Sequence, residues 1–233
     1  MFISFSILEK LMVLAGIGIK ELPSKSVILV EEELGPVKSI FAQRTAFNMV
    51  QKDKKVLYIT YRSKKEILEE MYFFQLYLNE GINILGDFRD NVALVEVVEK
   101  EFNGQSINYY LKNNKFGDIF DFDVCIIDTF SYFFIDTKFD TFLSTIESIM
   151  DSSRKNSIMF ILTTDMGIIP EKGELALRSL VDGVVQFRST YTGNKLIRYI
   201  NIPKMRGVLP LDQMVPYKVT SEGIVLDVRE RVG

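Results

Sequence analysis

The feature that most constrains the fold is an alternation of short apolar runs with longer stretches of helical periodicity. Four apolar runs follow this pattern, at residues 26–31, 55–61, 123–128 and 157–164. The stretches predicted as helices are residues 38–51, 65–78 and 139–154. Strands that are apolar on both faces and separated by helices are typical of a mostly parallel sheet covered on both sides.

The character of the sequence changes after Asp182. Short runs at 183–189, 195–203, 216–220 and 223–228 are separated by turn signals such as "TGN" and "SEG". These runs predict antiparallel strands that extend one edge of the sheet. The predicted fold is therefore a three-layer α/β domain with a mostly parallel central sheet and antiparallel C-terminal edge strands. No linker or internal repeat divides the chain, so we expect one domain over residues 1–233.

Composition excludes several classes of site. The 233 residues include no histidine, which rules out Ser-His-Asp triads and imidazole metal sites. The single cysteine, Cys125, lies in the apolar run "VCIID", so we expect a buried, inert thiol in a reducing compartment. The net charge of −3 gives no support to a basic nucleic-acid surface.

The N-terminal segment is apolar but short. Glu9 and Lys10 interrupt it, and the uncharged run at residues 11–19 is about half of the ~20 residues that cross a bilayer. We therefore expect no membrane insertion and a cytoplasmic protein.

In parallel α/β sheets, ligands bind beyond the carboxyl ends of the strands. The loop after the first strand, "VEEELGPVKS", can be aligned with the phosphate-binding pattern G-x-x-x-x-G-K-[ST] on Lys38 and Ser39. Glu32 and Val37 then stand at the two glycine positions, and only Gly35 remains, in the middle of the loop.

Each departure from the pattern opposes phosphate binding. Holding the β-branched Val37 at positive φ would cost about 1–2 kcal/mol, and Pro36 has no N–H to offer. The carboxylates at residues 31–33 would face a polyanion, at about 1–4 kcal/mol for one contact near 4 Å. We expect weak or absent ATP binding. The alternative is a plain turn into a helix, with Lys38 and Ser39 as ordinary first-turn residues.

The order of these segments resembles the RecA superfamily of P-loop ATPases, in particular its KaiC-like archaeal (FlaH-type) and bacterial branch. The segments that carry the resemblance are "ILEKLMVLAGIGIKELPSKSVILVEE", "KKVLYITYRSKKEI", "FDVCIIDTFS", "LRSLVDGVVQF" and "KLIRYINIPKMRG…YKVTSEGIVL". They cover residues 8–228. "FDVCIIDTFS" is similar to the Walker B strand.

The resemblance implies a nucleotide site at Gly35, Lys38, Ser39 and Asp128, if binding is retained. Magnesium would then be held by Ser39 and Asp128, the Walker B aspartate. The alternative for Asp128 is a cap at a strand end.

The family's second strand exits into a Glu-Glu pair, one of which activates water. Arg62 and Ser63 stand there in this chain, and neither accepts a proton as a carboxylate does. We therefore expect no catalytic residue.

Other positions keep two interpretations each. Thr163 and Thr164 match polar γ-phosphate sensors or form structural hydrogen bonds. Lys204 and Arg206 match basic residues that reach a neighbouring subunit's nucleotide, or else form a salt bridge within the chain. A separate prediction is that Phe133 and Phe134 form an exposed aromatic patch that binds a partner.

The first functional prediction is a non-hydrolysing KaiC-like protein with a decayed nucleotide site, regulatory or scaffolding, acting on a protein partner or as a homo-oligomer. No cofactor is expected. One alternative is an ATP-binding switch that uses ATP and magnesium with little or no hydrolysis. Another is a DNA-recombination accessory protein, although nucleic-acid binding is not favoured by the charge. A fully active ATPase with non-standard residues is the least favoured alternative.

Overall fold

A computed structural model describes residues 14–15, 19, 21–33, 35–77, 81–86, 122–135, 137–209 and 211–227. Its sheet has the strand order β3-β2-β4-β5-β1-β6-β7-β8-β9. The strands are β1 Val27–Glu32, β2 Val56–Thr60, β3 Ile82–Leu85, β4 Val124–Asp128, β5 Met159–Asp165, β6 Gly183–Thr192, β7 Lys195–Met205, β8 Val215–Thr220 and β9 Gly223–Leu226. All pairings from β3 to β6 are parallel, and those from β6 to β9 are antiparallel.

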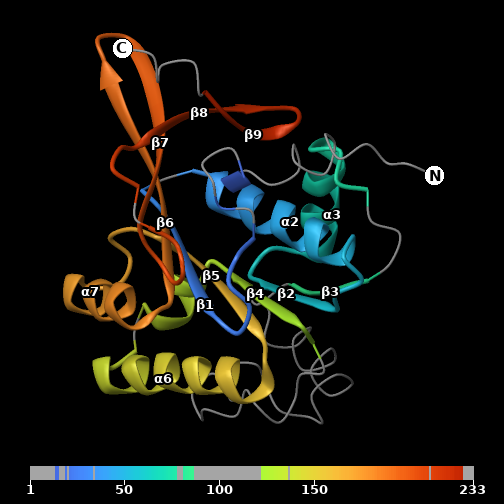
Figure 1. Ribbon diagram of the computed structural model, residues 1–233, viewed down its shortest axis with the longest axis vertical. Helices are drawn as coiled ribbons and strands as arrows, with labels where there is room; N and C mark the ends of the chain where they lie inside the picture. Colours follow the sequence, from blue (N-terminus) through green and yellow to red (C-terminus); the bar gives the residue numbers. More distant parts are fainter. Residues whose placement is uncertain are drawn as a thin grey trace.

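Helices cover both faces of the sheet, as Figure 1 shows. Helices α2 (Val37–Val50) and α3 (Lys64–Phe73) lie on one face, and α6 (Phe139–Asn156) and α7 (Glu171–Leu180) on the other. The alternation of buried residues along β1 explains this arrangement: Ile28 and Val30 join the core under α2, whereas Val27 and Leu29 join the core under α6. The three-layer α/β fold predicted from the sequence is confirmed.

The C-terminal strands depart from the prediction in one respect. β6 pairs in parallel with β1, so the antiparallel part begins only at β7. β6 and β7 continue past the sheet as a long hairpin, and β8 and β9 fold back over α2 (Figure 1). Among the described helices, none is long and apolar enough to span a membrane.

Several elements were missed or misplaced. Strand β3 and helix α7 had not been predicted, and the first four residues of the segment "LRSLVDGVVQF", residues 177–180, form the last turn of α7. Helix α3 ends at Phe73 rather than at residue 78, because Gln75 adopts φ 60° and leaves the helical conformation. Residue 78 itself, and most of the N-terminal run 11–19, lie outside the described residues.

The predicted aromatic patch is wrong at Phe134. This residue belongs to a short 3-10 helix, Phe130–Phe134, and only 3% of its surface is exposed. Its ring packs against Phe130 and Phe142 at centroid distances of 4.8 and 5.1 Å. The Phe133 side chain lies outside the described part. Cys125 is buried as predicted, and burial raises the pKa of its thiol.

Candidate functional site

The carboxyl ends of β2, β4, β5 and β1 lie side by side because these strands are neighbours in the sheet. Their registers place Thr60 beside Asp128 and Glu31 beside Thr164. Helix α2 begins at the same edge. Its first residue, Val37, follows a four-residue loop after Glu32, the last residue of β1. The sequence-predicted residues Lys38, Ser39 and Asp128 are thus brought together.

The loop between β1 and α2 has one residue at positive φ in its described part, Gly35 at φ 148°. Pro36 occupies the N-cap of α2 in a right-handed conformation, and Val37 is the first helical residue. The predicted strain at Val37 is therefore wrong: the loop does not require positive φ there. Val37 packs instead into the core, 3% exposed.

The carboxylate of Glu32 fills the hollow of this loop. Its Oε2 accepts a hydrogen bond from the backbone N–H of Lys38 at 3.0 Å. Its Oε1 lies against the bare α-carbon of Gly35, since a Cβ built there would be 2.5 Å away. Burial raises the pKa of Glu32, and the Lys38 N–H bond offsets part of this effect. Because Pro36 supplies no side-chain cap, Glu32 serves as the cap of α2.

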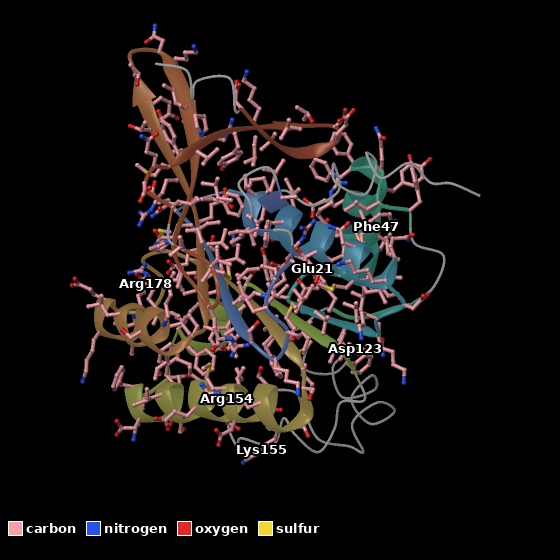
Figure 2. All side chains as sticks on the ribbon, viewed as in Figure 1. Glu21, Phe47, Asp123, Arg154, Lys155 and Arg178 are labelled. Carbon is pink, nitrogen blue, oxygen red and sulfur yellow. The ribbon has the colours of Figure 1, made fainter. Side chains whose placement is uncertain are left out.

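The neighbouring glutamates do not face the loop, contrary to prediction. Glu31 points to the opposite face of the sheet, where Arg178 and Gln186 donate to it at 2.9 Å. Arg178 lies on α7 beside the strands (Figure 2). Glu33 pairs with Arg188 at 2.9 Å. Of the three glutamates, only Glu32 therefore brings its carboxylate to the start of α2.

The Lys38 side chain is engaged within the protein. Its Nζ forms an ion pair with Asp165 Oδ1 at 2.6 Å and donates to the carbonyl oxygen of Gly35 at 3.0 Å. Only 6% of Lys38 is exposed. Asp165 ends β5, one strand away from β1, and had not been predicted as a site residue. The same strand-end rule that selected Asp128 would have selected it.

Asp128 lies at the centre of a buried network of hydroxyl groups. Its Oδ1 accepts from Ser39 at 2.9 Å and from Thr163 at 2.8 Å, and its Oδ2 accepts from Tyr58 at 2.9 Å. Burial raises the pKa of Asp128, although the three hydroxyl donors counteract part of the increase. Thr163 also accepts from the Thr129 backbone N–H at 2.6 Å. Thr163 thus makes the structural hydrogen bonds of its second interpretation.

Tyr58 was not predicted as a site residue, although its position in β2 indicates that it faces the same side of the sheet as Asp128. It pairs in register with Ile126, two residues before Asp128, so both polar groups point to the α2 face. The phenol is fully buried, and burial together with Asp128 raises its pKa well above the usual range. It therefore stays a hydrogen-bond donor at neutral pH.

Arg62 and Ser63 stand at the expected position of the glutamate pair, and both make structural contacts with helix α3. Arg62 forms an ion pair with Glu70 at 2.5 Å, and Gln43 donates to the same carboxylate at 2.5 Å. Ser63 is the N-cap of α3 and forms a capping box with Glu66. Among the described residues, nothing at the exit of β2 offers a free carboxylate to a water molecule.

Lys204 and Arg206 both bind groups of their own chain. Lys204 Nζ donates to the carbonyl oxygen of Ser179 at 2.8 Å, at the end of α7. Arg206 pairs with Asp182 at 3.1 Å and donates to the carbonyl oxygen of Ser24 at 2.7 Å. Arg206 thus forms the salt bridge that was one of its two interpretations.

These contacts decide whether the residues present fit a nucleotide. A phosphate-binding loop needs free backbone N–H groups and a free lysine at the helix N-terminus. Here an acidic side chain takes the Lys38 N–H and Asp165 takes the Lys38 ammonium. Ser39 and Asp128, 2.9 Å apart, are the residues that could hold magnesium. In this arrangement neither the Lys38 N–H nor its ammonium group is free for a polyphosphate, so the loop does not fit one.

Comparison with known proteins agrees with the fold. The structure is similar to that of the flagellar accessory protein FlaH from Methanocaldococcus jannaschii, with a TM-score of 0.72 and 18% identity over 92% of this chain and 94% of that one. No curated protein sequence matches the chain. A family model described as "ATPase: KaiC" matches residues 15–231. The chain therefore belongs to the KaiC family of RecA-superfamily P-loop ATPases.

Proposed function

We propose that this KaiC-family protein acts without binding or hydrolysing ATP, as a regulatory or scaffolding protein that works through protein contacts. The observation that carries the proposal is the Glu32 carboxylate, which bonds the Lys38 N–H at 3.0 Å inside the loop. The electropositive N-terminus of α2, which would attract a phosphate, already faces an internal negative charge. The Walker A loop is in this sense degenerate.

The ion pair of Lys38 strengthens the proposal. Triphosphate binding would require the ammonium to leave Asp165, from which it is 2.6 Å away, in a site where both side chains are largely buried. Separating a buried pair leaves an uncompensated carboxylate, which is strongly unfavourable. That carboxylate would then face the incoming polyanion. The repulsion of a triphosphate by two acidic side chains, Glu32 and Asp165, thus opposes its attraction to Lys38.

The exit of β2 supports the absence of hydrolysis. Arg62 cannot accept a proton from water, and the Ser63 hydroxyl is committed to the capping box of α3. Exposed aromatic side chains on and after α3 support action through protein contacts. These are Tyr72, Phe73 and Tyr77, with exposed fractions of 69%, 66% and 57%.

Thermal unfolding with and without 5 mM magnesium-ATP tests the proposal. A protein that binds ATP at a hundred times its Kd gains about 2.7 kcal/mol, which raises Tm by about 5–10 °C in a chain of this size. We expect no change. A rise in Tm that the Lys38→Ala variant loses would overturn the proposal.

An ATP-binding switch is the second candidate. The hydrogen bond between Ser39 and Asp128, at 2.9 Å, favours it because these two side chains would hold magnesium in the family's arrangement. The switch requires Glu32 to leave the loop when ATP enters. It therefore predicts the Tm increase that the first proposal excludes.

A further inference from the structure

Helix α3 leaves an apolar surface exposed on its outer side. We call this surface the outer face of α3, and its residues are Lys64, Lys65, Leu68, Glu69, Tyr72, Phe73 and, just after the helix, Tyr77. Leu68 is 41% exposed, and the three rings are more exposed still. The inner side is apolar as well, since Ile67 and Met71 lie in the core. A helix that is apolar on both sides is normally buried, so we expect the outer face to meet another surface.

The exposed rings are held in place by neighbouring rings. Tyr72 packs edge-on against Tyr77 at a centroid distance of 5.2 Å, and Phe73 packs edge-on against the buried Phe74 at 5.0 Å. Tyr77 reaches Tyr72 because the chain turns at Gln75, which adopts φ 60°. Rings that are already ordered lose little conformational entropy on binding, so they suit a docking surface.

The charged and aromatic groups of the outer face lie at opposite ends of the helix. Lys64 and Lys65 lie in its first turn, whereas the three rings lie at its C-terminal end and just beyond it. Lys65 pairs with Glu69 at 3.7 Å, but within the described part of the chain Lys64 forms no ion pair. The face thus has cations at one end and aromatic rings at the other, and the two kinds of group attract each other.

The area of the outer face is enough for a small protein interface. At about 150–250 Å² for a whole aromatic side chain, the exposed parts of the three rings amount to about 400 Å². With Leu68 and the lysine stems, two such faces would bury about 1,000 Å² in total, which is the lower limit of a specific interface. An open hollow of about 1030 Å³ lies over this face. Small-molecule sites enclose most of their ligand, so an open surface of this size suits a protein better.

We propose that the outer face of α3 binds the same face of a second copy of the chain, with the two helices antiparallel about a twofold axis at Leu68. Leu68 lies near the middle of this 10-residue helix, so the helices overlap over their whole length. Residues four apart share one side of a helix, so Lys64, Leu68 and Tyr72 form the line of contact. The axis places Leu68 against Leu68 and each Lys64 over the Tyr72 ring of the other copy. Parallel helices would instead place lysine against lysine.

Sedimentation velocity from about 1 to 200 µM tests this inference, which rests on the proposed function in that the chain acts through protein contacts. We expect a monomer–dimer equilibrium with a Kd on the order of 10 µM, as for a weak interface near the lower size limit. Tyr72→Ala combined with Phe73→Ala should weaken it at least tenfold, because aromatic anchors carry most of the binding energy. Tyr191→Ala removes a similarly exposed tyrosine from the β6–β7 hairpin, on the other side of the molecule (Figure 1), and should leave the Kd unchanged.

Disulfide crosslinking tests the orientation of the two helices. Cys125 is buried and unreactive, so only an introduced cysteine will crosslink. Leu68→Cys should form covalent dimers with itself on mild oxidation. Lys64→Cys should crosslink to Tyr72→Cys but not to itself, because about 12 Å along the helix separate the two copies of residue 64. Lys155→Cys, at an exposed position on α6, gives the background from random collisions.

Three results would overturn the inference. The first is a monomer at every concentration, and the second is a dimer whose Kd does not change in the Tyr72→Ala, Phe73→Ala variant when this variant is folded by circular dichroism. The third is an assembly in which Leu68→Cys does not crosslink above background, because such an assembly uses another surface. Failure of the proposed function is seen separately, as a rise in Tm with magnesium-ATP, whether or not the chain dimerises.

Discussion

Glu32 and Lys38 are joined across the loop that precedes α2, where the carboxylate of the first accepts the backbone N–H of the second at 3.0 Å. In a phosphate-binding loop a ligand oxygen takes this hydrogen bond. Here the side chain of Glu32, the last residue of β1, takes it, and the absence of a Cβ at Gly35 lets the carboxylate approach. The family fold is retained, and the proposed function takes this carboxylate to fill the position that a phosphate would occupy.

The contribution of the Glu32 cap to the stability of the protein can be measured by comparing two variants. Glu32→Gln keeps an oxygen that can accept the Lys38 N–H, whereas Glu32→Ala removes it. Urea unfolding should show that the alanine variant is less stable than the glutamine variant by about 1 kcal/mol, as for other N-cap losses. The same exchange at Glu33, whose side chain is half exposed and pairs with Arg188, should differ by less than about 0.5 kcal/mol. Equal stability of the two Glu32 variants would contradict the capping role.

The raised pKa of Glu32 makes the free energy of unfolding depend on pH. Between the ordinary glutamate pKa, about 4.3, and the raised folded value, the folded state binds more protons than the unfolded state. The free energy of unfolding therefore falls as pH rises through this window. Glu32→Gln cannot titrate, so its stability relative to the natural chain should increase with pH and then level off. A difference that is constant or decreases between pH 4 and 8 would be inconsistent with a raised pKa.

The Asp128 network predicts a large coupling between Ser39 and Tyr58. Their hydroxyls donate to opposite oxygens of one fully buried carboxylate. Ser39→Ala and Tyr58→Phe should each lower the free energy of unfolding by about 1–3 kcal/mol. A double-mutant cycle should give an interaction energy above about 0.5 kcal/mol. Ser144→Ala, which loses only a bond to a carbonyl oxygen of its own helix, is the control, with an effect within about 0.5 kcal/mol.

Restoring the glutamate pair should not restore hydrolysis. In the double variant Arg62→Glu with Ser63→Glu, carboxylates stand where the family places them, but Glu32 still fills the loop. Steady-state phosphate release should remain at the level of the buffer blank. The variant should also be less stable than the natural chain, because Arg62 loses its ion pair with Glu70. Turnover that depends on Lys38 would show that the loop admits ATP.

Much of the fold could be predicted from hydrophobic patterning. The runs that became β1, β2, β4 and β5 are apolar on both faces, and the predicted bounds differ from the observed ones by at most two residues. Strand β3 is a four-residue run whose first two residues are only half-buried, so its signal was weak. Helix α7 was missed because only two of its residues, Gly173 and Leu177, are buried.

The site could be predicted less completely. Strand-end logic found Lys38, Ser39 and Asp128, and the structure brings these residues together. The direction of the three glutamates could not be foreseen, because it depends on which residue of β1 faces α2 and on Arg178 and Arg188 as distant partners. The strain assigned to Val37 was wrong because the helix starts one residue earlier than predicted, at Val37 itself.

The most direct test is the amide resonance of Lys38 in a ¹H–¹⁵N spectrum, recorded while magnesium-ATP is added to 5 mM. With Glu32 bound to this N–H, we predict that the resonance does not move in the natural chain. It should move in the variant Glu32→Gly with Val37→Gly, in which both glycines of the phosphate-binding pattern are restored. A saturable shift of the Lys38 amide in the natural chain would contradict the account, because it would mean that ATP displaces the carboxylate.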